Sequence, residues 1–198
     1  MTIHLIHGFN VSDGGAGSVG KLAPYLPQPT QVMSYGWTGL VGLPCANRRA
    51  IRKLLQRVKP GDTLVAHSNG CLIAWQAAQI LGDQLAAVVC INPALRRDTD
   101  WPAGLPVLCL ANSTDWVVQL GRIWGRLYPD GIATQGWGAA GRYGFTKPNP
   151  AVSNWDTAMG WWGVPVTGHS GVFKDPAAPY WGERIAGWLE LSTAQSLR

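Results

Sequence analysis

Hydrophobic residues fall into short continuous runs along this chain, separated by segments in which they recur at helical spacing. The main runs cover residues 3–9, 30–37, 62–68, 85–94 and 105–113. Continuous apolar runs of this length predict strands that are buried on both faces, as in a parallel sheet covered by helices. A weaker run at 165–171 predicts one last short strand.

Helical spacing appears between these runs. In residues 46–58, Ala50, Leu54 and Val58 recur with basic residues between them, which is typical of an amphipathic helix. The other predicted helices cover residues 19–26, 70–81 and 180–195. Alternating strands and helices predict a single α/β domain over residues 1–198, with about six mostly parallel strands flanked by helices.

One segment, residues 117–165, follows neither pattern and is rich in glycine and tryptophan. It is longer than a simple connection needs, so we expect an insertion within the domain. Two interpretations stay open. The segment extends the helical layer over the sheet, or part of it folds over the functional site as a cap.

Composition agrees with a globular domain, because 46% of the 198 residues are hydrophobic. The formal net charge is +5, and much of the excess lies in residues 47–59. These basic residues fit the solvated face of the predicted helix. No nucleic-acid recognition motif accompanies them, so we expect no nucleic-acid partner.

The four cysteines, Cys45, Cys71, Cys90 and Cys109, form no C-x-x-C pair, and we expect buried, reduced thiols and no zinc site. No apolar run is long enough to span a bilayer. The first ten residues resemble a strand and not a secretion signal, which favours a cytoplasmic location, although export without a leader stays open.

The stretch "AHSNG" places Ser68 where a buried strand turns directly into a helix. Such a turn forces its central residue into a strained conformation that exposes the side chain. Ala66 and Gly70 supply the small side chains that the close approach of strand and helix requires. The backbone N–H of Asn69 lies at a helix N-terminus, where it is unpaired and favours negative charge. A hydroxyl and an anion site therefore arise from one turn.

"AHSNG" resembles the nucleophile elbow G-x-S-x-G of the α/β-hydrolase family, with alanine in the first position. "HLIHGF" is similar to the family's His-Gly segment after the first core strand, which places Phe9 at the second backbone donor of the oxyanion hole. "VLCLANSTDWVV" resembles the penultimate strand and acid loop, with Asp115 at the acid position. "VTGHSG" resembles the loop that carries the histidine, here His169. The order Ser, Asp, His is the order of this fold.

The resemblance implies a minimal α/β-hydrolase core that lacks the two leading strands of larger members. It also implies a serine hydrolase that cleaves carboxylic esters or thioesters through an acyl-Ser68 intermediate, with His169 as base and no metal or organic cofactor. Acyl transfer and amide cleavage use the same residues and stay open, as does a binding protein that kept the fold without catalysis. Aspartate at the elbow, as in dehalogenases and epoxide hydrolases of this fold, is absent.

Several other polar residues compete for these roles. We expect His67 to pack structurally beside the strand, His7 to shape the oxyanion loop, and His4 to be a hydrogen-bonded core or edge residue, the first two as the resemblance implies. Asp98 and Asp100 are alternative acids, since some hydrolases place the acid one strand earlier, but their surroundings are typical of a solvated turn.

The tryptophans between the acid and the base suggest an apolar substrate site. If part of residues 117–165 forms a cap, Trp116, Trp155, Trp161 and Trp162 would line it. Apolar walls with few polar groups suit an acyl chain, so we expect a small-molecule ester or thioester with a hydrophobic acyl group. The oligomeric state stays open.

Overall fold

The structure is a computed structural model that describes residues 1–36, 42–120, 137–158 and 166–196. These residues form one sheet of six parallel strands in the order β2-β1-β3-β4-β5-β6. The strands are β1 (Ile3–Ile6), β2 (Thr30–Met33), β3 (Thr63–His67), β4 (Ala87–Ile91), β5 (Val107–Ala111) and β6 (Val152–Asp156). The predicted α/β fold with a parallel sheet is confirmed.

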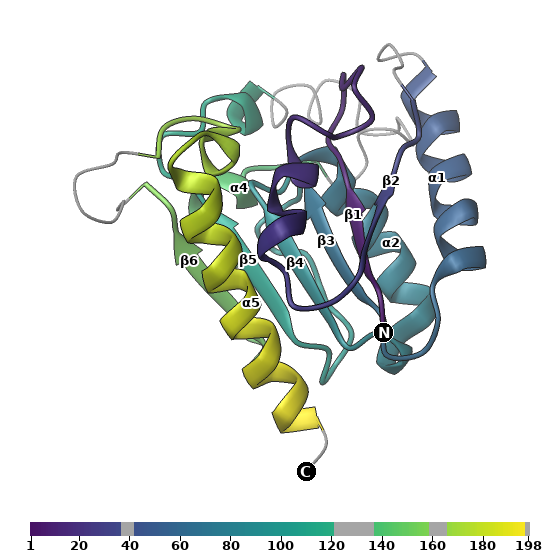
Figure 1. The fold of residues 1–198 in the computed structure, drawn as a ribbon. Coiled ribbons are helices and arrows are strands. Elements are labelled where there is room, and N and C mark those ends of the chain that lie inside the picture. The colour runs from purple at the N-terminus through teal and green to yellow at the C-terminus, as the bar shows by residue number, and fades with distance from the viewer. Residues whose placement is uncertain (37–41, 121–136, 159–165, 197–198) are drawn as a thin grey trace.

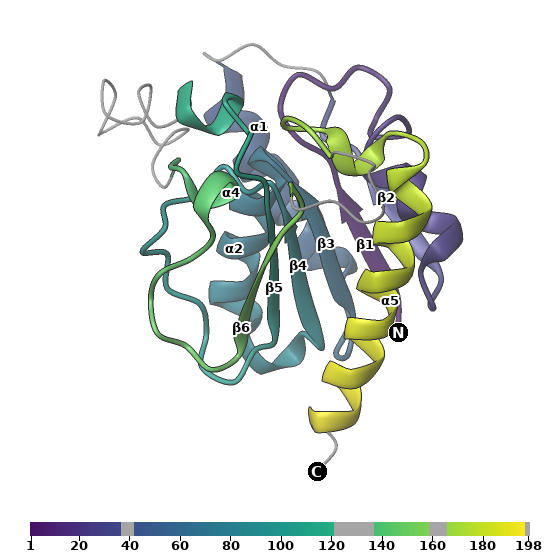
Figure 2. The ribbon, with the colours of Figure 1, turned by 90° about the vertical axis from the view of Figure 1, so that its left-hand side faces the viewer.

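Helices cover both faces of the sheet. The described helices are the α-helices α1 (Leu43–Arg57), α2 (Asn69–Leu81), α4 (Ala140–Tyr143) and α5 (Ala177–Ser196), and the 3-10 helices η1 (Val19–Tyr25), η3 (Gly82–Gln84) and η4 (Gly171–Phe173). In Figures 1 and 2, α5 and η1 lie on one face, and α1 and α2 lie on the other. Within the described ranges, no helix combines the length and the apolar character that crossing a bilayer requires.

Each face of the sheet has its own hydrophobic cluster. In β3, Leu64 and Ala66 pack in the cluster under α1 and α2, whereas Val65 packs in the cluster under α5 and η1. Every residue of β3 is buried. A strand that is covered on both sides needs apolar residues at consecutive positions, which explains the continuous runs in the sequence.

Helix α1 has the predicted amphipathic character and begins slightly earlier than the pattern indicates. Pro44 lies in its first turn, where its fixed φ favours helix initiation and its missing N–H costs nothing. Ala50 and Leu54 are buried. The exposed basic residues of the helix are Arg48, Arg49, Arg52, Lys53 and Arg57.

The last strand is not where the sequence pattern puts it. The prediction of a strand within 165–171 is wrong, because the described residues there form a turn that leads into η4. Gly168, with φ of 73°, breaks the extended conformation. The sixth strand is β6, which lies inside the segment 117–165. None of its residues is fully buried, so its sequence VSNWD needs no apolar run.

The side of the sheet on which the next strand is added changes between β1 and β3. After β1 the chain forms β2 on one side, and then it returns to form β3 on the other side of β1. The helix after β1, η1, lies on the face of α5, while the helix after β3, α2, lies on the opposite face (Figure 1). Ligands of open α/β sheets bind at the carboxyl ends of strands at such a switch point. Gly8 and Ser68 follow β1 and β3 at this place.

The start of α2 touches the backbone of β1, which yields a stability test. A Cβ added to Gly70 would lie 2.5 Å from the His7 carbonyl oxygen and 2.6 Å from that of Ile6. We expect Gly70→Ala to lower the free energy of unfolding by about 3 kcal/mol, because overpacking against backbone forces a helix or a strand to move. Urea unfolding followed by circular dichroism measures the change.

The matched control is Gly187→Ala in α5. Gly187 is exposed, and a Cβ there would meet no atom within 4 Å. Alanine at this helical position should raise the free energy of unfolding by about 0.5 kcal/mol or more. If Gly70→Ala behaved like this control, the close contact between α2 and β1 would be wrong.

Candidate active site

Ser68 lies between β3 and α2 in a conformation that residues with side chains rarely adopt. Its φ is 55° and its ψ is −121°, which costs about 1–3 kcal/mol. Three backbone hydrogen bonds hold the turn. The Ser68 N–H donates to the Ile91 carbonyl at 3.0 Å, and the Ser68 carbonyl accepts from Cys71 N–H at 3.1 Å and Ala94 N–H at 3.2 Å. The strand-to-helix turn therefore has the strained geometry that the sequence predicts.

The backbone after β1 lies directly against this turn. A Cβ on Gly8 would lie 3.0 Å from Ser68 Cβ and 3.2 Å from His67 Nδ1. Glycine at this position lets the peptide that joins Gly8 to Phe9 approach the serine. Among the described residues, no acceptor is found for the backbone N–H of Phe9 or of Asn69, the first residue of α2. Two backbone donors are thus available close to Ser68.

The carboxylate of Asp115 is fully buried and holds His169. Its Oδ2 lies 2.7 Å from His169 Nδ1. Oδ1 accepts from the N–H groups of Val117 at 3.0 Å and Val118 at 3.4 Å, and Asn92 Nδ2 donates to Oδ2 at 3.1 Å. Because a carboxylate only accepts hydrogen bonds, Nδ1 of His169 carries the hydrogen. Nε2 is then free to accept a proton.

Asn92 was not predicted from the sequence as a site residue, yet its side-chain amide donates to the Asp115 carboxylate. It directly follows β4 with φ of 45°, and its side-chain amide also points at the Gly141 carbonyl, 3.4 Å away. The signal that could have identified it is its position. A polar residue directly after a continuous apolar strand lies at the same edge of the sheet as Ser68.

Polar side chains tie the loop of Asp115 to the loop of His169. Asn112, which follows β5, donates to the Val166 carbonyl at 2.9 Å and to Thr157 Oγ1 at 3.0 Å. Thr114 Oγ1 accepts from the Gly168 N–H at 2.9 Å. The backbone on the N-terminal side of His169 is therefore held at two points, which positions its imidazole over the buried carboxylate.

His169 is connected to the elbow through His67. The two imidazole centroids are 4.8 Å apart, and His67 Nε2 donates to the His169 carbonyl oxygen at 3.0 Å. Between Ser68 and His169, both of which the structure describes, no hydrogen bond is present. Such contacts are often long without substrate and tighten when it binds. Ser68, Asp115 and His169 thus lie at one region of the carboxyl edge, with the Asp115–His169 link formed.

His67 is unsuited to the role of base. Burial lowers the pKa of His67 to about 3, and the neighbouring His169 adds to the effect. Because a carbonyl oxygen only accepts, the imidazole carries its hydrogen on Nε2, and its Nδ1 is buried without a partner in the described part of the chain. The structural role expected for His67 agrees with these contacts.

The other polar candidates lie elsewhere or are already paired. Asp98 and Asp100 form exposed ion pairs with basic neighbours at 2.7 and 2.8 Å. His4 Nε2 lies 2.9 Å from Asp62 Oδ2, and both side chains are buried. Asp62 precedes β3, so this pair lies at the amino edge of the sheet, away from Ser68.

The four tryptophans predicted to line a substrate site have different positions. Trp116, next to Asp115 in the sequence, is 62% exposed. Trp155 belongs to β6 and packs in the cluster under α5, with the Arg184 guanidinium 5.0 Å from its ring centroid. Trp155 is therefore part of the sheet itself, with its ring on the face that α5 covers. Trp161 and Trp162 lie outside the described residues.

Trp137, which the sequence places in the same segment, reaches the elbow. Its Nε1 donates to Asn69 Oδ1 at 3.2 Å. The backbone at Gly141 lies so close to Asn92 that only glycine fits there, since a Cβ would lie 2.6 Å from the Asn92 carbonyl carbon. This part of the segment thus packs against the ends of β3 and β4, beside the candidate site.

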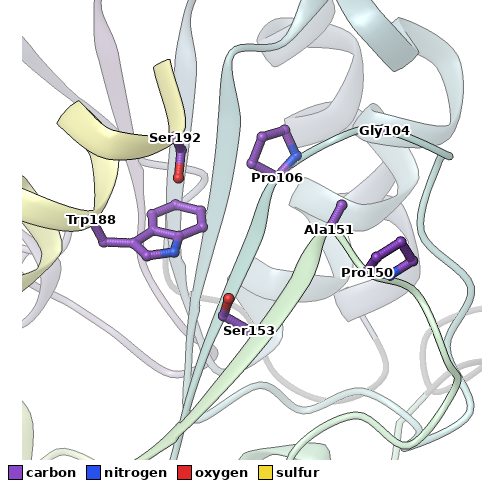
Figure 3. A pocket seen from close by; sticks show the side chains of 7 residues that line it. All are labelled: Gly104, Pro106, Pro150, Ala151, Ser153, Trp188 and Ser192. Carbon is purple, nitrogen blue, oxygen red and sulfur yellow. The ribbon is translucent and has the colours of Figure 1, made fainter. Parts of the chain in front are cut away.

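A separate cavity of about 230 Å³ lies at the amino ends of β5 and β6, against α5 (Figure 3). It is lined by Gly104, Pro106, Pro150, Ala151, Ser153, Trp188 and Ser192. None of these side chains is titratable near neutral pH, so the cavity offers no acid, base or strong nucleophile. Among the described residues, no group of three or more His, Cys, Asp and Glu side chains is arranged to hold a metal ion.

No protein-family model and no curated protein sequence matches the chain. Solved structures share its fold. A YdeN-like hydrolase from Pectobacterium atrosepticum is 17% identical with a TM-score of 0.53, over 96% of this chain and 91% of that one. A monoacylglycerol lipase from Paleococcus ferrophilus is 14% identical with a TM-score of 0.61, over 96% and 94%. A pyrethroid hydrolase from Sphingobium faniae is 13% identical with a TM-score of 0.60, over 96% and 97%. Likeness at these identities shows a common fold.

The lowered pKa of His67 makes a prediction about acid stability. The folded pKa is about 3 and the unfolded pKa about 6.5. Between these values the unfolded chain binds a proton that the folded chain does not, so stability falls as the pH drops below about 6.5. In His67→Gln the unfolded chain no longer binds this proton at position 67. The glutamine amide replaces the imidazole as the donor to the His169 carbonyl. We expect the variant to lose less stability between about pH 7 and pH 4.5, as measured by urea midpoints. Equal losses in both proteins would contradict the neutral, buried state of His67.

Proposed function

We propose that this chain, which has the α/β-hydrolase fold, is a serine hydrolase that cleaves carboxylic esters or thioesters of small molecules. Ser68 is the nucleophile, His169 is the general base, and Asp115 orients His169 and stabilises its charged form. The backbone N–H groups of Phe9 and Asn69 form the oxyanion hole. The proposed chemistry uses no metal or organic cofactor.

The observation that carries this proposal is the 2.7 Å contact between His169 Nδ1 and the buried Asp115 carboxylate, at the sheet edge where Ser68 is strained. Burying a carboxylate costs free energy unless it is hydrogen-bonded, and this one has four donors around it. The contact fixes the tautomer that a base needs. An ion pair with a purely structural role would not require a strained serine at the same edge.

The reaction proceeds in two steps that use the same groups. Ser68 Oγ attacks the carbonyl carbon, and His169 Nε2 accepts the hydroxyl proton. The tetrahedral intermediate then collapses, the bond to the leaving oxygen or sulfur breaks, and His169 returns the proton to that atom. Water attacks acyl-Ser68 with the same proton transfer through His169, which releases the carboxylic acid and restores the serine.

Negative charge develops on the carbonyl oxygen in both steps. The N–H of Asn69 belongs to the first residue of α2, and the N–H of Phe9 follows the glycine that lies against Ser68. Donors in such positions are worth about 3 kcal/mol each in comparable sites. Because they are backbone groups, their placement depends on the loops after β1 and β3.

The surroundings of the site support an apolar acyl group. The exposed ring of Trp116 follows Asp115, and the indole of Trp137 reaches Asn69. Aromatic side chains on the residues that neighbour the proposed acid and nucleophile would favour hydrophobic substrates over highly polar ones. The lipase among the structural neighbours agrees with an ester substrate. Acyl transfer to another acceptor and amide cleavage would proceed through the same acyl-Ser68 intermediate.

Turnover of short p-nitrophenyl esters tests the proposal. We expect Ser68→Ala to remove nearly all of the activity and to leave only the small residue that substrate binding and the oxyanion donors still supply. Asp115→Asn should lower kcat by about 10⁴-fold with little change in the fold, because the imidazole loses its correct tautomer. Initial rates together with circular dichroism measure both effects.

The matched control is Asp98→Asn, which removes an exposed carboxylate and leaves Asp115 in place. An exposed ion pair contributes little, so this variant should keep its kcat within about twofold. Full activity in purified Ser68→Ala would rule out Ser68 as the nucleophile. A large loss in Asp98→Asn with none in Asp115→Asn would move the acid to the other loop.

A further inference from the structure

Tyr35 follows β2 and joins the loops that carry both proposed oxyanion donors. Its hydroxyl donates to the Gly8 carbonyl at 2.7 Å, with the His7 carbonyl farther away at 3.2 Å. The same hydroxyl accepts from Asn69 Nδ2 at 3.2 Å. Its ring stacks on the His7 imidazole, with centroids 4.3 Å apart and planes inclined by 13°.

The Gly8 carbonyl accepts two hydrogen bonds. His7 Nδ1 lies 2.8 Å from it and must carry the hydrogen, since a carbonyl oxygen only accepts. His7 Nε2 is then an acceptor, and it lies 3.4 Å from the Tyr35 N–H. Burial lowers the pKa of His7 and raises that of Tyr35, so the imidazole stays neutral and the phenol keeps its proton. Each donor and acceptor in this set is thus consistent with the others.

These bonds act on the peptide that contains the Phe9 N–H. A peptide unit is planar and almost always trans, so the Gly8 C=O and the Phe9 N–H point in opposite directions within one rigid plane. Two donors that hold the Gly8 oxygen therefore set the direction of the Phe9 N–H. Hydrogen bonds to the carbonyl also polarise the unit, which makes its N–H a stronger donor.

The Asn69 side chain links Tyr35 to the second donor. Asn69 Nδ2 also donates to Asn47 Oδ1 at 2.9 Å, and Trp137 Nε1 donates to Asn69 Oδ1 at 3.2 Å. The amide is buried and has partners at both of its polar atoms. Tyr35 is therefore the one described side chain that bonds both the Gly8 carbonyl and the residue after Ser68.

We propose that Tyr35 is a positioning residue of the oxyanion hole, which aims the Phe9 N–H through the Gly8 carbonyl and couples it to Asn69. This inference rests on the proposed serine hydrolase function. Tyr35 does not contact the substrate in this role. It lowers the barrier by holding backbone donors where negative charge develops, which matters more for the transition state than for the bound ester.

Tyr35→Phe separates this role from simple packing, because phenylalanine keeps the ring that stacks on His7 and removes only the hydroxyl. We expect kcat for p-nitrophenyl esters to fall about 10-fold or more, less than the 10²–10³-fold loss of a whole oxyanion donor, while KM changes by less than about threefold. The thermal unfolding midpoint should stay close to that of the wild type. Tyr180→Phe, which removes a phenol hydroxyl on α5, is the matched control and should keep its kcat.

A transition-state mimic provides a second measurement. When phenylboronic acid binds, the Ser68 oxygen adds to boron, its proton passes to His169, and an anionic tetrahedral adduct forms. In Tyr35→Phe the inhibition constant should weaken by about the same factor as kcat/KM, because both depend on the oxyanion donors. Wild-type kcat and boronate affinity in a folded Tyr35→Phe would overturn the role of Tyr35.

A control for stability repeats the kcat and boronate measurements of Tyr35→Phe in protein that also contains the stabilising Gly187→Ala substitution. Loss of kcat that persists in folded protein of both backgrounds supports positioning. Loss that disappears when the fold is stabilised means that Tyr35 only supports the structure, and the proposal fails. If the wild type itself shows no esterase activity and no boronate binding, the proposed function fails, and the role of Tyr35, which rests on it, fails with it.

Discussion

The site depends on backbone contact between the end of β1 and the elbow after β3. These strands are neighbours at the switch point of the sheet, and their connections leave toward opposite faces. The contact leaves no room for side chains, which is why Gly8 and Gly70 occupy it. It places the Gly8–Phe9 peptide and the first N–H of α2 around one strained serine. The proposed nucleophile and both proposed oxyanion donors are thus positioned by the same close approach.

Three histidines lie around this contact, and their hydrogen-bond partners give them different properties. His7 and His67 each donate to a carbonyl oxygen, and burial lowers the pKa of both. They stay neutral, so they add no positive charge beside the imidazolium that His169 would form during catalysis. Of these three, only His169 is in contact with a carboxylate among the described residues. The same sheet edge thus contains one suitable base and two neutral imidazoles that hold backbone in place.

The parallel sheet could be predicted because strands that are buried on both faces are continuous apolar runs, and the residues after them meet at one edge. Ser68 was predicted in this way, whereas Asp115 and His169 were predicted from a resemblance in short motifs, and the side chains of these last two are in contact in the structure. The edge strand β6 could not be found, since its half-exposed residues need no apolar run. Tyr35 and Asn92 were missed because their importance arises from contacts with Gly8 and Asp115, which are distant in the chain.

The most direct test of the central claim, that Ser68 is an activated nucleophile, is covalent labelling with a fluorophosphonate followed by peptide mass spectrometry. Attack by Ser68 Oγ on phosphorus expels fluoride and leaves a stable phosphonyl ester, a reaction that unactivated serines undergo very slowly. The account predicts one label per chain, on the peptide that contains Ser68, and none on Ser170 beside His169. Absence of any label on folded protein, or a label on another serine, would contradict it.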